Sequence, residues 1–216
     1  MSVKENYEKI KKTVPSEVSV IAVVKHQTND DITALYEAGQ KSFAENKVQD
    51  FLEKAAHFSN FDMDWHFIGH LQRNKVKYIV DKVSLIHSLD SFRLAEEISK
   101  RSLANGIVMD CLIQVNTGDE EQKYGIPFMD CQKFLETLQD LEGIRIIGLM
   151  AVTPYSDDPE DARPYFKQMK ELYDKISEIK YNNATMDVLS MGMSNDYQIA
   201  IEEGATMVRI GSLLFY

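Results

Sequence analysis

The sequence predicts an α/β fold, a (β/α)8 TIM-type barrel built by residues 1–216 as a single domain with an extra N-terminal helix. Eight short apolar segments alternate with helical segments, which is typical of a parallel sheet that eight strands can close. The first segment, Val18 to Lys25, is rich in β-branched residues without polar alternation, as expected for a strand covered on both faces. A doubly wound open sheet is the alternative, but Lys25-His26-Gln27 is not the glycine-rich turn that usually follows an early strand there.

Seven further strands follow in order, each a short apolar segment bounded by charged or turn-forming residues. Together with the first, they cover residues 18–25, 42–44, 64–69, 83–87, 109–115, 144–150, 186–190 and 207–210. In such a barrel the carboxyl ends of all strands lie on one face, so the residues that follow each strand are expected to meet there.

The predicted helices fill the segments between the strands. They cover residues 3–13, 30–38, 45–58, 71–80, 91–104, 127–138, 159–179 and 194–203. Gly39 suits a helix C-cap, and Pro127 lies near a helix start, where proline is favoured. The sequence ends soon after the eighth strand, so helix 3–13 is expected to cover the place of a full eighth helix.

Composition excludes several classes of function. A net charge of −10 argues against a nucleic-acid or anionic-membrane surface. The chain contains no apolar run near the roughly 20 residues needed to span a bilayer. Cys111 and Cys131 have neither metal-ligand nor redox spacing, so both are expected to be reduced and buried. These features predict a cytoplasmic protein without a metal site.

Polar residues and glycines gather where the predicted strands end. They are Lys25, Asn46, His66, Gly69, His70, Asn116, Met150, Ser190, Gly192, Ser194, Arg209 and Gly211. The segments Ser190 to Asp196 and Arg209 to Ser212 follow the last two strands, where barrels of this kind bind phosphate through backbone N–H groups. Each alone is explained by a turn or a helix cap, but together they predict a phosphate site.

These segments carry a family resemblance that covers nearly the whole chain. The matching segments are Ala22 to Lys25, Glu45 to Gln49, His66 to Lys75, Ser190 to Asp196 and Ala200 to Ser212. The sequence resembles the pyridoxal-phosphate-binding YggS/PROSC-type family, relatives of the N-terminal barrel of alanine racemase. The resemblance implies a protein of pyridoxal 5′-phosphate homeostasis that stores, buffers or delivers this cofactor without robust catalysis. It implies no catalytic residues, and apo-enzymes that require the cofactor are the possible partners.

The resemblance also implies roles for individual residues. Lys25 resembles the family's Schiff-base lysine, Asn46 the asparagine beside the cofactor, and Arg209 the arginine that faces the pyridine nitrogen. The other residues expected to bind the cofactor are Ser194, Gly211 and Ser212 in the phosphate cradle, Ile68 and Gly69 in the pocket wall, and Ser190. A cationic arginine at the pyridine nitrogen disfavours its protonation, which weakens the ring as an electron sink.

Some positions depart from the family pattern. Val24 stands where serine is usual, and Ala44 and Lys47 replace the usual glycine and tyrosine. Lys47 is a second amine that either competes for the Schiff base or lowers the pKa of Lys25.

Two other functions remain as alternatives. An amino-acid racemase needs an acid/base group on each face of the cofactor, and alanine racemase takes the second from a C-terminal β-domain of its partner subunit. This sequence ends at Tyr216 without such a domain, which favours a monomeric binding protein. A lysine-dependent aldolase acting on sugar phosphates uses the same kind of barrel and phosphate site, and the motifs favour it least.

Overall fold

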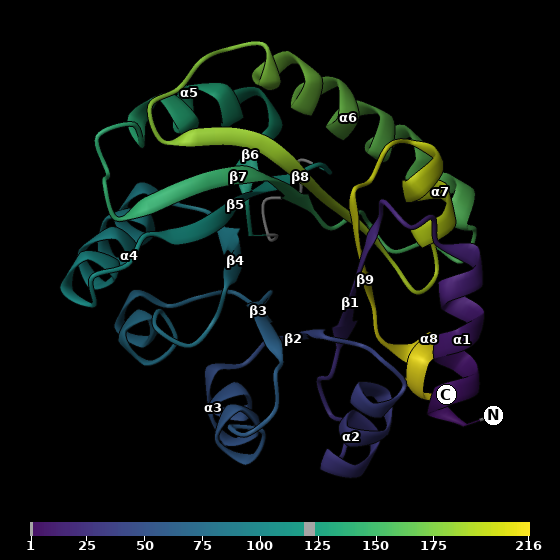
Figure 1. The fold of residues 1–216 in the computed structure, drawn as a ribbon. Coiled ribbons are helices and arrows are strands. Elements are labelled where there is room, and N and C mark those ends of the chain that lie inside the picture. The colour runs from purple at the N-terminus through teal and green to yellow at the C-terminus, as the bar shows by residue number, and fades with distance from the viewer. Residues whose placement is uncertain (1, 119–123) are drawn as a thin grey trace.

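The computed structural model describes residues 2–118 and 124–216, and its strands form a closed parallel barrel (Figure 1). In order around the barrel, the strands are β1 (Ser19–Val23), β2 (Ser42–Glu45), β3 (Asp64–Phe67), β4 (Leu85–Leu89), β5 (Met109–Asn116), β7 (Ile144–Ala151), β8 (Ala184–Met193) and β9 (Met207–Ile210). Pairing of β9 with β1 completes the ring. A short strand β6 (Ile126–Pro127) adds to the end of β5. The predicted (β/α)8 barrel is confirmed.

Helices surround the barrel on its outer side (Figure 1). The α-helices of the described residues are α1 (Val3–Thr13), α2 (Asn29–Glu37), α3 (Val48–His57), α4 (Phe92–Ala104), α5 (Cys131–Thr137), α6 (Arg163–Ser177), α7 (Tyr197–Glu202) and α8 (Ser212–Phe215). Three 3₁₀ helices join them, η1 (Arg73–Tyr78), η2 (Phe128–Asp130) and η3 (Pro159–Ala162). None of the helices in this part of the chain combines the length and the apolar character needed to cross a membrane.

Several predicted helices were wrong in type or length. The predicted helix 71–80 is the 3₁₀ helix η1, where Arg73 and Lys77 place like charges four residues apart, a spacing that destabilises an α-helix. The predicted helices 127–138 and 159–179 each begin with a 3₁₀ turn. The predicted helix 194–203 begins only at Tyr197, because the preceding strand β8 runs on to Met193.

Helix α1 occupies the place beside the short α8, as predicted. Its start is a capping box, in which the Glu5 N–H donates to Ser2 Oγ (3.3 Å) and the Ser2 N–H donates to Glu5 Oε2 (2.8 Å). The buried Asn6 donates from Nδ2 to the carbonyl of Leu214 in α8 (3.3 Å). Figure 1 shows α1 and α8 side by side near both chain ends.

The barrel separates two apolar layers. Outside it, fully buried aromatic residues such as Phe43, Phe51 and Phe166 fill the space between strands and helices. Inside it, a smaller cluster consists of Ile21, Ala44, Leu85, Leu112, Met150 and Met207. Because side chains alternate along a strand, His66, His87, Ser190 and Arg209 share the inner face with this cluster. Cys111 and Cys131 are buried and unbridged, as predicted.

Candidate functional site

Lys25 lies in a tight turn at the carboxyl end of β1, and its side chain is exposed. The Gln27 N–H donates to the carbonyl of Val24 (3.1 Å), which closes the turn around Lys25 and His26. His26 has a φ of 66°, the left-handed conformation that a type II turn requires at its third residue and that usually selects glycine. Such a conformation costs an L-residue about 1–2 kcal/mol, and strain of this kind clusters at functional sites.

A buried ion pair anchors the same turn. The Lys54 ammonium donates to the carbonyl of Val24 (2.6 Å) and pairs with the carboxylate of Glu45, whose side chain is fully buried. The other Glu45 oxygen accepts the N–H of Asn46 (3.0 Å). The pair therefore links the turn that carries Lys25 to Asn46 at the end of the neighbouring strand.

Asn46 carries an unsatisfied polar atom. Within residues 2–118 and 124–216, its buried Oδ1 has no hydrogen-bond partner. Leaving a buried acceptor unpaired costs about 1–3 kcal/mol, so this oxygen is available for a donor from a ligand. Gly69 lies against Asn46, since a Cβ at position 69 would come within 1.9 Å of the Asn46 carbonyl oxygen. Only glycine allows the chain after β3 to approach Asn46 so closely.

Arg209 is buried inside the barrel beside β1. Its guanidinium donates from Nη1 to Ser190 Oγ (2.7 Å) and from Nη2 to the carbonyl of Ala151 (2.8 Å). Burial lowers the pKa of Arg209 to about 10, and the nearby Asp196 opposes this shift. Arg209 therefore remains cationic at neutral pH, although its two hydrogen-bond acceptors are uncharged.

The loops after β8 and β9 meet at Ser194. Its hydroxyl oxygen accepts the N–H of Gly211 (3.2 Å) and lies 3.5 Å from the N–H of Leu213. Gly192 has a φ of 89°, and a Cβ there would come within 2.5 Å of the Ala200 side chain. A cavity of about 250 Å³ opens beside these loops, between the segments after β7 and β8. The three predicted cradle residues, Ser194, Gly211 and Ser212, therefore come together.

Comparison with known proteins identifies the family. The family described as "Alanine racemase, N-terminal domain" matches residues 1–216. The chain belongs to this family. Among its relatives, the pyridoxal phosphate homeostasis protein of Aquifex aeolicus is 47% identical over 204 residues, which are 94% of this chain and 83% of the relative. The protein of the same name from Escherichia coli is 33% identical over 204 residues, covering 93% and 86% of the two chains.

Solved structures of the family share the barrel. PipY of Synechococcus elongatus with pyridoxal phosphate bound superposes with a TM-score of 0.91 at 30% identity, covering 100% of both chains. Alanine racemase of Clostridium difficile superposes with a TM-score of 0.74 at 13% identity, covering 99% of this chain and 56% of that chain. The likeness to alanine racemase at this identity is one of fold.

The residues of the family motifs fit pyridoxal phosphate chemically. Lys25 offers an amine, Asn46 a buried oxygen without a partner, and Arg209 a buried cation. Ser194 and Gly211 offer a hydroxyl and backbone where the loops after β8 and β9 meet. This set matches the needs of an aldehyde, an aromatic ring and a phosphate.

The structure also shows the surroundings of the other predicted residues. His66 and Ser190 do not follow their strands but lie within β3 and β8, because strand length depends on pairing with neighbouring strands. Ile68 is half-buried and packs on the inner apolar cluster. His70 stacks on Tyr124, with ring centroids 3.8 Å apart, and its Nδ1 lies 3.3 Å from the Asp90 carboxylate.

Lys47, the second amine near the site, is exposed, and so is Tyr155 in the loop after β7. Lys47 caps the start of α3 without a side-chain hydrogen bond. Tyr155 is 86% exposed and donates to Asp157 (3.0 Å). The sequence did not single out Lys54 or His87. Lys54 contacts Val24, 30 residues away, and His87 contacts Ser190, 103 residues away. The sequence offers one signal for Lys54: it is a charged residue on the same predicted helix as the apolar Phe51, which is buried.

Proposed function

We propose that the protein holds pyridoxal 5′-phosphate as a Schiff base on Lys25 and stores, buffers or delivers it inside the cell, without robust catalysis. The observation that carries this proposal is the pairing of strands β1 and β9. It places the strained lysine turn next to the strand that bears Arg209, a buried cation with neutral partners. Relatives at up to 47% identity are named pyridoxal phosphate homeostasis proteins.

The roles of the chain's own residues follow from their chemistry. The cofactor supplies an aldehyde carbon, which condenses with an unprotonated amine with loss of one water molecule. The ion pair of Lys54 and Glu45 orients the turn of Lys25 for this attachment. Asn46 Oδ1 accepts a hydrogen bond, and Ser194, whose oxygen accepts the Gly211 N–H, donates its hydroxyl proton to the phosphate. Arg209 stays cationic, which disfavours protonation of the ring nitrogen and so limits carbanion chemistry.

In this proposal the protein acts as a monomer. The recipients in this proposal are apo-enzymes that require the cofactor. Amino-acid racemase is the second candidate, because the family that matches the chain is described as the N-terminal domain of alanine racemase.

Reduction and peptide mapping test the attachment. The protein loaded with pyridoxal phosphate is reduced with borohydride, digested and analysed by mass spectrometry. We expect the adduct on the peptide that contains Lys25, and Lys25→Ala should lose it. Lys47→Ala is the matched control and should keep it. An adduct confined to Lys47 or Lys75 contradicts the assignment.

A ligand pair tests the phosphate cradle. Ser194→Ala should weaken binding of pyridoxal phosphate by roughly 10- to 100-fold, the usual value of a hydrogen bond to a charged group. Binding of pyridoxal, which lacks the phosphate, should change little. Equal losses for both ligands indicate a damaged fold, and unchanged affinity removes Ser194 from the site.

Isotope exchange separates the two candidate functions. The loaded protein is incubated with L-alanine in deuterated water, and both deuterium uptake and chirality are followed. Slow exchange with retained configuration is the expected result. Rapid accumulation of D-alanine supports the racemase.

A further inference from the structure

A chain of hydrogen bonds crosses the interior of the barrel. Asp64 Oδ2 lies 2.9 Å from His66 Nε2, and His66 Nδ1 lies 3.0 Å from His87 Nε2. His87 Nδ1 lies 3.2 Å from Ser190 Oγ, which accepts from Arg209 Nη1 at 2.7 Å. The chain runs from β3 through β4 to β8 and β9. Its first member, Asp64, is partly exposed, and the other four are buried.

The two ends of the chain determine the direction of every hydrogen bond. A guanidinium only donates and a carboxylate only accepts. With neutral histidines, the carboxylate of Asp64 requires a proton on His66 Nε2, so His66 Nδ1 accepts from His87 Nε2–H. His87 Nδ1 must then accept the proton of the Ser190 hydroxyl, whose oxygen accepts from Arg209. One arrangement of protons therefore satisfies all four contacts.

The charges around the chain support this arrangement. Burial, together with His66 and Arg209, lowers the pKa of His87 well below its ordinary value, so His87 is neutral. Burial alone would raise the pKa of Asp64, but His66, which is hydrogen-bonded to it, and hydrogen bonds from Ser84 and Ser42 bring it to about 2. The end of the chain at Asp64 is therefore a carboxylate at neutral pH.

We infer that His66 and His87 are positioning residues that orient the Arg209 guanidinium through the Ser190 hydroxyl. With Nη1 held by Ser190 and Nη2 held by the carbonyl of Ala151, the plane of the guanidinium is fixed. This inference deepens the proposed function, on which it rests, because the fixed guanidinium is the group proposed to face the pyridine nitrogen. Ser190 was expected to bind the cofactor. In this inference its hydroxyl instead holds the Arg209 guanidinium.

Nitrogen-15 NMR of the protein without cofactor tests the proton order. At neutral pH, His87 should carry its proton on Nε2 and have an unprotonated Nδ1 that accepts from Ser190. A proton on Nδ1 of His87 reverses the chain and overturns the inference. This measurement needs neither a variant nor a bound ligand.

Two substitutions at position 87 test the consequence for the cofactor. His87→Leu breaks the chain, and pyridoxal phosphate affinity should fall about three- to tenfold, the effect of losing a neutral hydrogen bond. The visible absorption band of the bound cofactor should also shift. His87→Gln keeps one donor and one acceptor and should restore both properties. His57→Gln, at an exposed histidine of α3, is the matched control.

The outcomes separate the inference from the proposed function. If the unmodified protein takes up no pyridoxal phosphate, the proposed function fails. If it binds the cofactor and His87→Leu matches it in affinity and absorption band, the positioning role alone is wrong. Loss of affinity in His87→Leu without recovery in His87→Gln also contradicts the role, because shape rather than hydrogen bonding then matters.

Discussion

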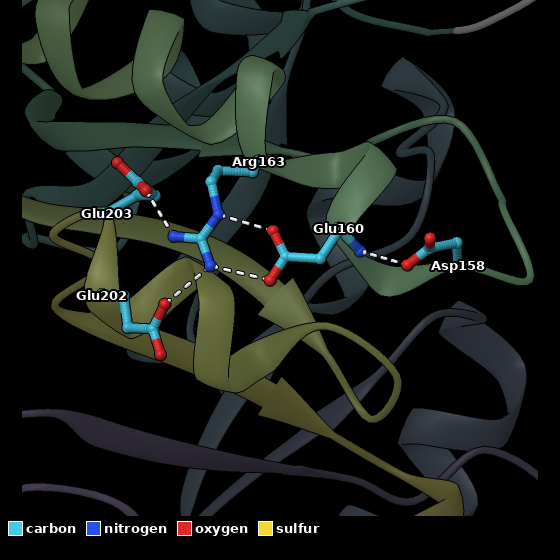
Figure 2. A network of polar contacts seen from close by, with 5 residues as sticks. All are labelled: Asp158, Glu160, Arg163, Glu202 and Glu203. Carbon is cyan, nitrogen blue, oxygen red and sulfur yellow. Dashed lines mark hydrogen bonds and ion pairs between the residues drawn. The ribbon is translucent and has the colours of Figure 1, made fainter.

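Two arginines of this protein make opposite kinds of contact. On the surface, Arg163 at the start of α6 binds three carboxylates, those of Glu160, Glu202 and Glu203, at 2.6–2.7 Å (Figure 2). These contacts raise its pKa. Inside the barrel, Arg209 donates to a hydroxyl and a carbonyl, and burial lowers its pKa to about 10.

The difference separates a structural arginine from one that is suited to bind a ligand. The contacts of Arg163 clamp α6 and η3 to the end of α7, and its charge is matched within the fold. A buried cation with neutral partners is costly, and an apolar residue is often at least as stabilising. Stability therefore does not explain Arg209, which agrees with the cofactor-binding role proposed for it.

Breaking a buried ion pair should have the largest effect. Lys54 differs from Arg209 in that its buried charge is matched, by Glu45. Glu45→Leu leaves that ammonium unpaired and should lower the free energy of unfolding by about 3–5 kcal/mol, measured by urea denaturation. The double variant Glu45→Leu with Lys54→Met should recover most of the loss. A single variant within about 1 kcal/mol of the parent protein contradicts this account.

Removing the charge of Arg209 should reduce ligand affinity more than stability. Arg209→Met should weaken pyridoxal phosphate binding by roughly 10- to 100-fold. The free energy of unfolding should change less, because loss of a buried charge offsets the unpaired acceptors at Ser190 and Ala151. Arg163→Met is the matched control and should leave affinity unchanged. Equal affinity losses in Arg209→Met and Arg163→Met would contradict the distinction between the two arginines.

The surface clamp should contribute modestly and depend on salt. Arg163→Met should lower the midpoint of thermal unfolding by about 2 °C at low ionic strength, as expected for exposed ion pairs. The difference from the parent protein should shrink in high salt, which screens exposed charges. Thermal scans at two salt concentrations measure both effects. A large shift that is insensitive to salt would indicate a packing role.

A further effect concerns Asp64 and pH. Its pKa is about 2 in the folded protein and about 3.9 in an unfolded chain. A lowered carboxylate pKa stabilises the fold above pH 4, and this contribution is lost as the pH falls from about 4 to about 2. Relative to Asp64→Asn, the parent protein should therefore lose part of its stability between pH 6 and pH 3. Asp62→Asn, at an exposed aspartate, should show no such difference.

The fold was predictable because each strand is marked by a local pattern in the sequence. Apolar, β-branched runs such as residues 18–25 identified the strands, and their alternation with helices indicated the barrel. The 3₁₀ helix η1 was not predicted, because the apolar spacing of residues 71–80 resembles that of an α-helix. The like charges of Arg73 and Lys77, rather than the apolar spacing, distinguish η1 from an α-helix.

The grouping of candidate site residues was predictable only at the ends of strands or between strands that follow each other in the sequence. The grouping of Ser194 with Gly211 followed from two adjacent strands, and the position of Lys25 from the end of β1. Contacts between residues far apart in the sequence have no local signature. His87 meets Ser190 103 residues later, and Lys54 meets Val24 30 residues earlier, so neither pairing could be read from spacing.

The left-handed backbone at His26 has a consequence for the motion of the lysine turn. A glycine at this position would relieve the folded-state strain, but it would also widen the conformations open to the unfolded chain. The two effects oppose each other in the free energy of unfolding, while the greater backbone freedom of glycine loosens the folded turn. If Lys25 carries the cofactor as proposed, His26→Gly should therefore alter the rate of cofactor exchange while overall stability stays nearly constant.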